Sequence, residues 1–103
     1  MEKNYLKKKI QTIVNSFKEQ KFNFVISKSI DCLKEFPKTV ILYNLLGSSY
    51  QSIGEYLKAK DVFIEGLKLD SENIAIKNNL ATCYKYLLQY ENSENLYKEI
   101  IKT

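Results

Sequence analysis

The amino-acid sequence predicts an all-α fold, an α-solenoid of three helical hairpins and therefore six helices. Three observations carry this prediction. The sequence repeats itself at an offset of 34 residues, a period typical of stacked helical hairpins. Apolar residues recur at three- and four-residue spacing inside each copy, as on the buried face of an amphipathic helix. One proline and three glycines in 103 residues leave few turn signals for a sheet.

The repeat is clearest in the second half of the chain. Residues 40–69 align with residues 74–103 without a gap. The identical pairs are Asn44 and Asn78, Leu46 and Leu80, Tyr50 and Tyr84, Tyr56 and Tyr90, Glu65 and Glu99, and Lys68 and Lys102.

A third, more divergent copy lies at the start of the chain. The same offset pairs Phe22 with Tyr56 and Leu33 with Leu67. A chain of this length is the size of one ordinary domain. We therefore expect a single domain over residues 1–103, with repeats at about 6–39, 40–73 and 74–103.

The six helices are predicted over residues 4–18, 22–35, 39–52, 56–69, 73–87 and 90–102. The breaks between copies have physical causes. Pro37 ends the second helix because its ring clashes with a continuing helix. Asp70 and Ser71 are expected to cap the fifth helix by accepting hydrogen bonds from its free backbone N–H groups.

Each hairpin also needs a turn between its two helices. Gly54 holds this place in the second copy, and glycine accepts the positive φ that closes many helix C-termini. Gln20 and Leu88 hold the same place in the first and third copies. We expect these two turns to be less favourable or differently shaped.

A set of residues in the second copy stands at the spacing of a known repeat: Tyr43, Leu46, Gly47, Tyr50, Tyr56, Ala59, Phe63 and Gly66. These residues resemble the tetratricopeptide repeat, whose helix-turn-helix units stack into a right-handed solenoid with a concave groove. Small residues stand where paired helices approach closely, and aromatic residues stand where gaps need filling. The resemblance extends over nearly the whole chain.

The first copy departs most from the repeat, because Lys9, Ile13 and Ser16 take the tryptophan, glycine and tyrosine places. At the other end, the sequence shows no capping helix after the sixth predicted helix. Solenoid ends need polar caps. We therefore expect apolar surface suited to assembly at Leu96, Ile100 and Ile101.

The resemblance implies that the first helix of each hairpin lines the concave groove. The residues expected to face this groove are Lys7, Gln11, Asn44, Ser48, Gln51, Asn78, Asn79, Thr82 and Lys85. Amides both donate and accept hydrogen bonds, which suits them to the backbone of an extended peptide. The alternative, that these are solvated polar positions in an asparagine-rich chain, stays open.

Some family members bind the C-terminal tails of chaperones through a carboxylate clamp of lysine, asparagine and arginine. The corresponding places here hold Ile10, Val14, Leu45, Ala75 and Asn79. Only Asn79 is polar, and the chain has no arginine. The sequence therefore argues against chaperone-tail binding through that clamp.

Charge gives a weak argument for nucleic acid. The net charge is +4, but every cation is lysine, and arginine is the better partner for bidentate phosphate and base contacts. The basic run from Lys7 to Lys9 could attract an acidic peptide or a phosphate backbone. The alternative is that this run is a solvated helix face. Most tyrosines hold packing places of the repeat. Nucleic acid is thus disfavoured as a partner.

No residue pattern suggests catalysis. The chain has no histidine, no phosphate-binding glycine loop and no serine or cysteine beside a base. Cys32 and Cys83 lack metal-ligand spacing and are expected to be buried. We expect no enzyme activity, metal or cofactor. Without a signal peptide or a membrane span in the sequence, we expect a cytoplasmic protein.

The function predicted from the sequence is a non-catalytic scaffold that binds a protein or an extended peptide in its concave groove. Two alternatives stay open. In the first, the chain is a self-associating assembly element that uses its last helix pair. In the second, it is the N-terminal targeting module of a larger enzyme. The identity of the partner lies beyond the sequence, because a repeat specifies a surface and not a task.

Overall fold

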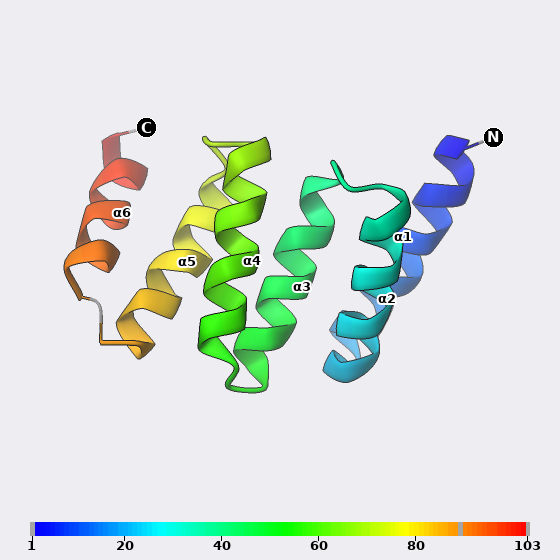
Figure 1. Ribbon diagram of the computed structural model, residues 1–103, viewed down its shortest axis with the longest axis horizontal. Coiled ribbons are helices and arrows are strands. Elements are labelled where there is room, and N and C mark those ends of the chain that lie inside the picture. The colour runs from blue at the N-terminus through cyan, green and yellow to red at the C-terminus, as the bar shows by residue number, and fades with distance from the viewer. Residues whose placement is uncertain (1, 89, 103) are drawn as a thin grey trace.

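The computed structural model describes residues 2–88 and 90–102 (Figure 1). Its helices are α1 (Glu2–Lys18), α2 (Phe22–Glu35), α3 (Val40–Ser52), α4 (Tyr56–Leu69), α5 (Ile74–Tyr86) and α6 (Tyr90–Lys102). The predicted all-α fold with six helices is confirmed. The predicted helix ends agree within two residues: Thr39 and Asn73 precede α3 and α5 as cap residues, and Leu87 follows α5.

The helices form three antiparallel hairpins, α1–α2, α3–α4 and α5–α6, placed side by side in a row (Figure 1). The row measures 43 × 27 × 20 Å. Each helix packs on the next one along the chain, and α3 also contacts α1 and α5. The first helices of the hairpins therefore form one layer. This arrangement is the predicted helical solenoid.

The start of α5 corrects one prediction. Asn73, and not Asp70 or Ser71, caps this helix: its Oδ1 accepts a hydrogen bond from the backbone N–H of Ile76 at 2.9 Å. An N-cap residue must immediately precede the first helical residue. Asp70 acts one step earlier, because its Oδ2 accepts a hydrogen bond from Asn73 Nδ2 at 3.1 Å.

The three turns within the hairpins have a left-handed residue at the same repeat place. Gln20, Gly54 and Leu88 have φ values of 61°, 84° and 61°. Their backbone N–H groups each donate to the carbonyl three residues earlier, at 2.9, 3.1 and 3.1 Å. The expectation of a different shape at Gln20 and Leu88 is therefore wrong. Only glycine adopts this left-handed conformation without steric cost, so the two other residues make their turns less favourable.

Replacing the exposed Gln20 with glycine is expected to stabilise the protein by about 1 kcal/mol, because it relieves this cost and removes no core contact. Urea unfolding checks the change through the transition midpoint at constant slope. The control Gln20→Ala keeps a Cβ in the left-handed conformation. If it stabilises as much as Gln20→Gly, backbone strain at Gln20 is not the cause.

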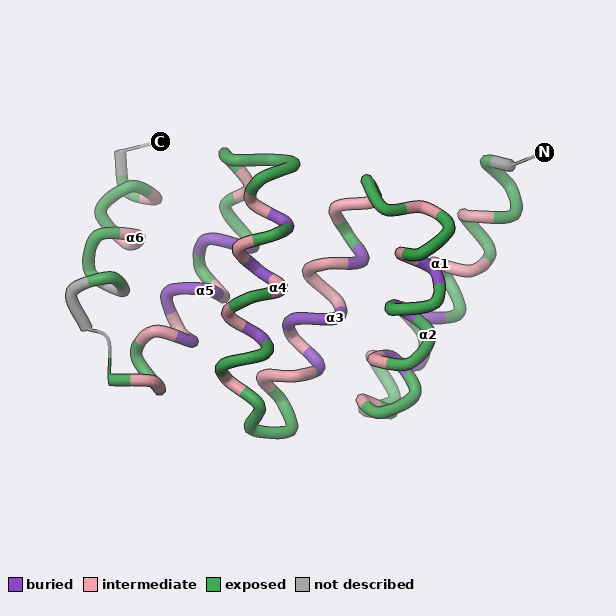
Figure 2. The backbone as a smooth tube through the Cα atoms, in the orientation of Figure 1, coloured by how far each residue is buried: buried purple, intermediate pink, exposed green. Residues whose placement is uncertain are grey.

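The core lies between the helices and has two parts. Buried residues occur in every helix from α1 to α5 (Figure 2). One cluster contains Ala59, Phe63, Ile76, Leu80 and Cys83, and the other contains Ile13, Val25, Cys32 and Leu42. None of the described residues of α6 is buried. The middle of the row is thus its best-packed part.

Two glycines permit close helix packing. A Cβ at Gly47 of α3 would lie 2.7 Å from Cδ1 and Cζ of the Phe63 ring on α4. A Cβ at Gly66 of α4 would lie 3.0 Å from Ile76 Cδ1 and from Tyr43 Cβ. Both distances are tighter than ordinary contacts between carbon atoms. The small-residue places predicted in the second repeat are therefore real points of close approach.

The first hairpin fills its interior in the opposite way. Ile13 on α1 and Ser29 on α2 stand at the repeat places of Gly47 and Phe63. They are 2% and 0% exposed. The large side chain thus belongs to the first helix in this hairpin and to the second helix in the next. The hydroxyl of Ser29 has no hydrogen-bond partner among the described residues.

Candidate functional site

The residues predicted to face the groove lie on α1, α3 and α5. Lys7 and Gln11 belong to α1; Asn44, Ser48 and Gln51 to α3; Asn78, Asn79, Thr82 and Lys85 to α5. Four of these residues are exposed, and the other five are half-buried: Asn44, Ser48, Gln51, Asn79 and Thr82. Because α3 contacts both α1 and α5, these polar residues are carried by one layer of neighbouring helices.

A hydrogen-bonded amide pair joins two of these helices. Asn79 Nδ2 donates to Asn44 Oδ1 at 2.8 Å and lies 3.4 Å from Ser48 Oγ. Both amides are half-buried. Within the described part of the chain, Asn44 Nδ2 and Asn79 Oδ1 have no further hydrogen-bond partner. The pair thus keeps one donor and one acceptor for a ligand, in a fixed relative position.

The structure pairs Asn44 with Asn79 and not with Asn78, its repeat equivalent. The side chain of Asn78 is exposed, and its backbone carbonyl accepts from Thr82 Oγ1 at 3.2 Å. Gln11 Nε2 donates to Asn15 Oδ1 within α1 at 2.9 Å. The structure therefore shows one amide pair between hairpins, with other polar side chains on the same helices.

The first helices carry few acidic residues. Helix α3 has no charged residue, and the charged residues of α5 are Lys77 and Lys85. Glu2 is the one carboxylate in the sequence of α1, α3 and α5. Lys7 and Lys85 form no ion pair with a described carboxylate. A ligand along these helices would meet amides, hydroxyls and ammonium groups.

A hollow of about 420 Å³ adjoins this surface at the end of α5. Its lining residues are Thr82, Lys85, Tyr86, Leu88 and Tyr97. Thr82 and Lys85 were predicted from the sequence as groove residues, whereas the hollow itself was not predicted. The alignment of Leu88 with Gly54 could have indicated it, because a leucine at the glycine place of a turn is unfavourable for folding and points to another role.

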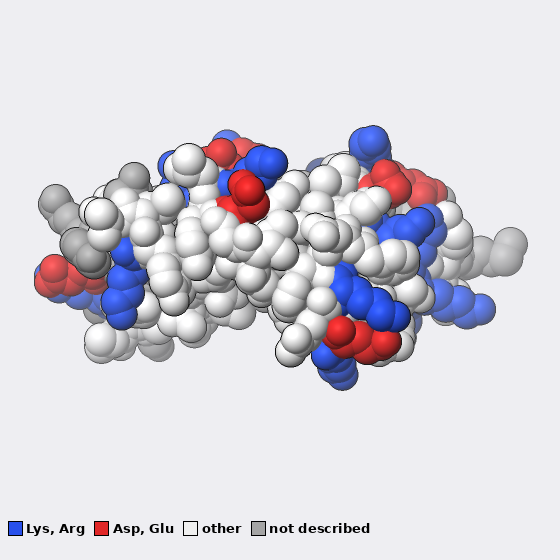
Figure 3. All heavy atoms as spheres, turned by 90° about the horizontal axis from the view of Figure 1, so that it is seen from below, with Lys and Arg blue, Asp and Glu red and all other residues white. Residues whose placement is uncertain are grey.

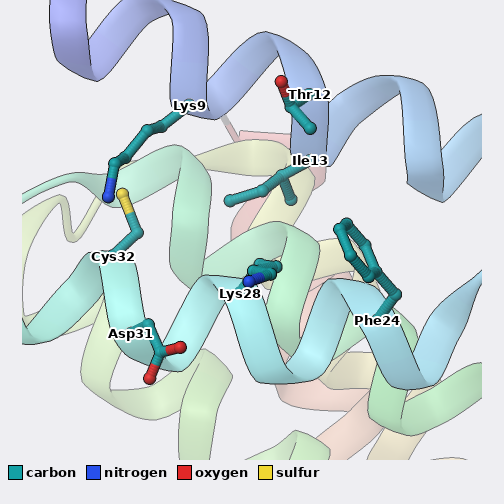
Figure 4. Close-up of a pocket in the computed structure, with 7 residues that line it drawn as sticks. All are labelled: Lys9, Thr12, Ile13, Phe24, Lys28, Asp31 and Cys32. Carbon is teal, nitrogen blue, oxygen red and sulfur yellow. The ribbon is translucent and has the colours of Figure 1, made fainter.

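A second hollow, of about 240 Å³, lies between α1 and α2 (Figure 4). Ile13, Phe24 and Cys32 supply apolar side chains, and the polar lining residues are Lys9, Thr12, Lys28 and Asp31. Figure 4 shows Lys9 reaching from α1 toward Cys32 on α2. Lys9 occupies the place of Tyr43. A slender lysine therefore stands where the second hairpin has a ring.

The third hairpin also has a lysine at this repeat place. Lys77 is 5% exposed, and its Nζ lies 3.7 Å from Glu72 Oε2 and 3.4 Å from Glu99 Oε2. A buried ammonium group is tolerated when carboxylates pair with it. This ion-pair group was not predicted, although the alignment of Lys77 with the aromatic Tyr43 was a signal in the sequence.

The predicted assembly residues are not equally exposed. Leu96 packs partly against the core cluster of α4 and α5. Ile100 is half-buried, whereas Ile101 is 83% exposed. Of the three, Ile101 presents the most apolar surface.

Both cysteines are buried free thiols, as expected. Burial raises the pKa of the Cys83 thiol to about 11. Burial also raises the pKa of Cys32, although the nearby Lys9 ammonium acts in the opposite direction. A raised pKa disfavours the thiolate, which is the nucleophilic form of cysteine, and buried thiols are generally unreactive. The described residues include no cluster of metal-ligating side chains and no helix long and apolar enough to cross a membrane.

Sequence comparisons agree with the fold. A family model of the tetratricopeptide repeat matches residues 40–73. An uncharacterized protein of Pyropia yezoensis, ycf37, is 30% identical over 60 residues, which are 58% of this chain and 34% of that protein. The chain thus spans about a third of the length of the curated relative it matches.

Solved structures show the same architecture. The second TPR of Spaghetti (RPAP3), bound to HSP90 peptide SRMEEVD, gives a TM-score of 0.89 at 14% identity over 93% of this chain and 89% of that chain. MamA (MSR-1) gives 0.86 at 16% identity, over 94% of this chain and 56% of that one. MamA (AMB-1) gives 0.86 at 18% identity, over 94% and 53%. At these identities the likeness concerns the fold.

The fold is therefore that of a helical repeat solenoid. Residues 40–73 are a tetratricopeptide repeat, and the resemblance to that family inferred from the sequence is confirmed. Tetratricopeptide solenoids are interaction scaffolds that present an extended concave surface to other proteins.

Proposed function

We propose that the chain is a non-catalytic scaffold that binds an extended segment of a partner protein along α1, α3 and α5. The observation that carries this proposal is the Asn44–Asn79 pair. In the same proposal, residues 1–103 form one domain with repeats at about 6–39, 40–73 and 74–103. The cytoplasmic location stays a prediction from the sequence.

The amide pair suits the backbone of a peptide. Asn44 Nδ2 can donate to a peptide carbonyl while Asn79 Oδ1 accepts from a peptide N–H. These interactions are independent of the ligand's side chains. Because the two amides already hold each other in place, binding loses less side-chain entropy than it would with two free residues.

The charge of the surface narrows the choice of partner segment. Glu2 is the one acidic residue in the sequence of the first helices, and Lys7 and Lys85 contribute positive charge. A neutral or acidic segment is favoured over a basic one. Two of the places of the chaperone-tail clamp hold Ile10 and Leu45, which pack against the core. The proposed groove therefore works without that clamp.

Selection from a random-peptide display library, followed by fluorescence anisotropy with an enriched peptide, tests the proposal. Asn44→Ala with Asn79→Ala is expected to weaken binding roughly thirtyfold, because two hydrogen bonds of about 1 kcal/mol each are lost. Circular dichroism must show that the double variant remains helical.

A matched control is Asn23→Ala with Asn95→Ala, which removes two exposed amides from the second helices α2 and α6. We expect this control to bind normally. Unchanged affinity in the Asn44→Ala, Asn79→Ala variant would reject the groove.

The exposure of Ile101 favours a second candidate function, self-association through the last helix pair. Light scattering over a range of concentrations tests it, and Ile101→Lys should then shift the protein toward the monomer. A monomer at every concentration contradicts this candidate. The third alternative, the N-terminal targeting module of a larger enzyme, stays a prediction from the sequence.

A further inference from the structure

The hollow beside α5 has a rigid aromatic wall. The ring of Tyr86 stacks on Tyr56 of α4, with centroids 4.6 Å apart and planes at 7°. Tyr97 of α6 and Leu88 complete the apolar lining. Tyr86 is 61% exposed although its ring is held in this stack. A side chain entering the hollow would thus contact surfaces that are already in position.

Leu88 is poorly explained by the requirements of folding. Its φ of 61° is unfavourable for a residue with a Cβ, and the equivalent turn of the second hairpin uses Gly54. The leucine side chain is 72% exposed, so it also contributes little to the core. The same φ at Gln20 shows that the strain belongs to the turn. What distinguishes Leu88 is its large exposed apolar side chain, which suits contact with a partner.

The described residues that line the hollow are mostly apolar. Figure 3 views the edge that carries the turns within the hairpins: uncharged atoms cover most of its centre, one group of acidic and basic atoms lies near the middle of the view, and others lie toward both ends. Ile53 and Leu57, beside the α3–α4 turn, are 43% and 61% exposed. Lys85 is the one charged residue among the described residues that line the hollow.

We propose that this hollow receives a large apolar side chain of the partner segment, with an acidic neighbour that pairs with Lys85. The inference rests on the proposed function, because Thr82 and Lys85 belong to the groove. The ring or branched chain packs on Tyr86, Leu88 and Tyr97, and the carboxylate lies at the ammonium group. The hollow thereby supplies the side-chain selectivity that the Asn44–Asn79 pair lacks.

Leu88→Gly separates this role from any role in folding. The glycine relaxes the turn, so the variant is expected to unfold at a higher urea concentration than the unmodified chain. It also removes one wall of the hollow. We expect its affinity for the enriched peptides to fall roughly tenfold, the effect of losing one buried leucine contact, and the preference for an apolar anchor to disappear.

Gln20→Gly is the matched control, because it relaxes the equivalent turn of the first hairpin far from the hollow. It should stabilise the fold and leave the peptide profile unchanged. Lys85→Glu should turn the preference for an acidic neighbour into one for a basic neighbour. If the Leu88→Gly and Lys85→Glu proteins select the same peptides as the unmodified chain, the anchor is refuted.

The same selections separate the two proposals. Peptides that depend on Asn44 and Asn79 but not on Leu88 support the groove and refute the anchor. Peptides that depend on Leu88 and Lys85 but not on the amides support the anchor and refute the backbone-reading groove. Absence of any enriched peptide on the unmodified chain overturns both.

Discussion

Gly47→Ala is expected to destabilise the protein by about 3 kcal/mol, a large share of the stability of a small domain. The new methyl group would enter the space of the Phe63 ring, whose Cδ1 and Cζ lie 2.7 Å from the Cβ position. Phe63 is fully buried, so its ring is surrounded by other side chains and cannot turn outward into solvent without disturbing the core. Helices α3 and α4 must therefore separate, and urea unfolding followed by circular dichroism measures the cost.

A second substitution tests whether this contact is the cause. Phe63→Leu removes ring atoms and alone should cost about 1 kcal/mol. Combined with Gly47→Ala, it should recover about 2 kcal/mol of the loss, since the two residues touch and their effects are not additive. Gly66→Ala is the graded control, because its Cβ would meet neighbours at 3.0 Å. A cost for Gly47→Ala no greater than that of Gly66→Ala would contradict the argument.

Ile13→Ala is expected to cost about 3 kcal/mol, because it leaves a cavity in the core of the first hairpin. At the repeat place that Phe63 holds in the second hairpin, α2 has the small buried Ser29. No large side chain of α2 therefore fills this space when Ile13 is shortened. Adding Ser29→Phe should restore part of the loss, since the pair then resembles Ala81 and Tyr97 of the third hairpin. Ser29→Phe alone should destabilise by overpacking.

Thermal and urea unfolding of the two single variants and the double variant measure this coupling. The expected result is a double variant more stable than Ile13→Ala by at least about 1 kcal/mol. Strictly additive losses would show that Ile13 and Ser29 do not share one space. The irregular first repeat would then need another explanation.

Much of the fold was predictable because its determinants lie close together in sequence. Apolar spacing, Pro37 and the place of Gly54 suffice to divide the chain into helices and turns, since each acts within a turn or two of helix. The repeat offset then orders the helices into hairpins. The cap of α5 was predicted at Asp70 and Ser71, whereas Asn73 forms it. This is an error of a few residues at a helix boundary.

The binding surface was predictable only in part. Repeat alignment placed the polar residues on the first helices, because facing positions recur with the period of the repeat. It matched Asn44 with Asn78, but the hydrogen bond forms with Asn79. The hollow at Leu88 was not predicted either, because residues from α5, α6 and the turn between them line it together and meet only in the folded chain.

The sequence by itself determined the helices, the hairpins, the repeat class and the absence of catalytic residue patterns. Tertiary structure alone decided which amides form a hydrogen bond. It also decided that the large core side chain is Ile13 on the first helix of the first hairpin and Phe63 on the second helix of the next. The left-handed conformation of Gln20 and Leu88 was likewise visible only in the structure. The reason is physical. Helices follow from local spacing, whereas contacts between residues 35 positions apart, such as Asn44 and Asn79, depend on how neighbouring hairpins stack.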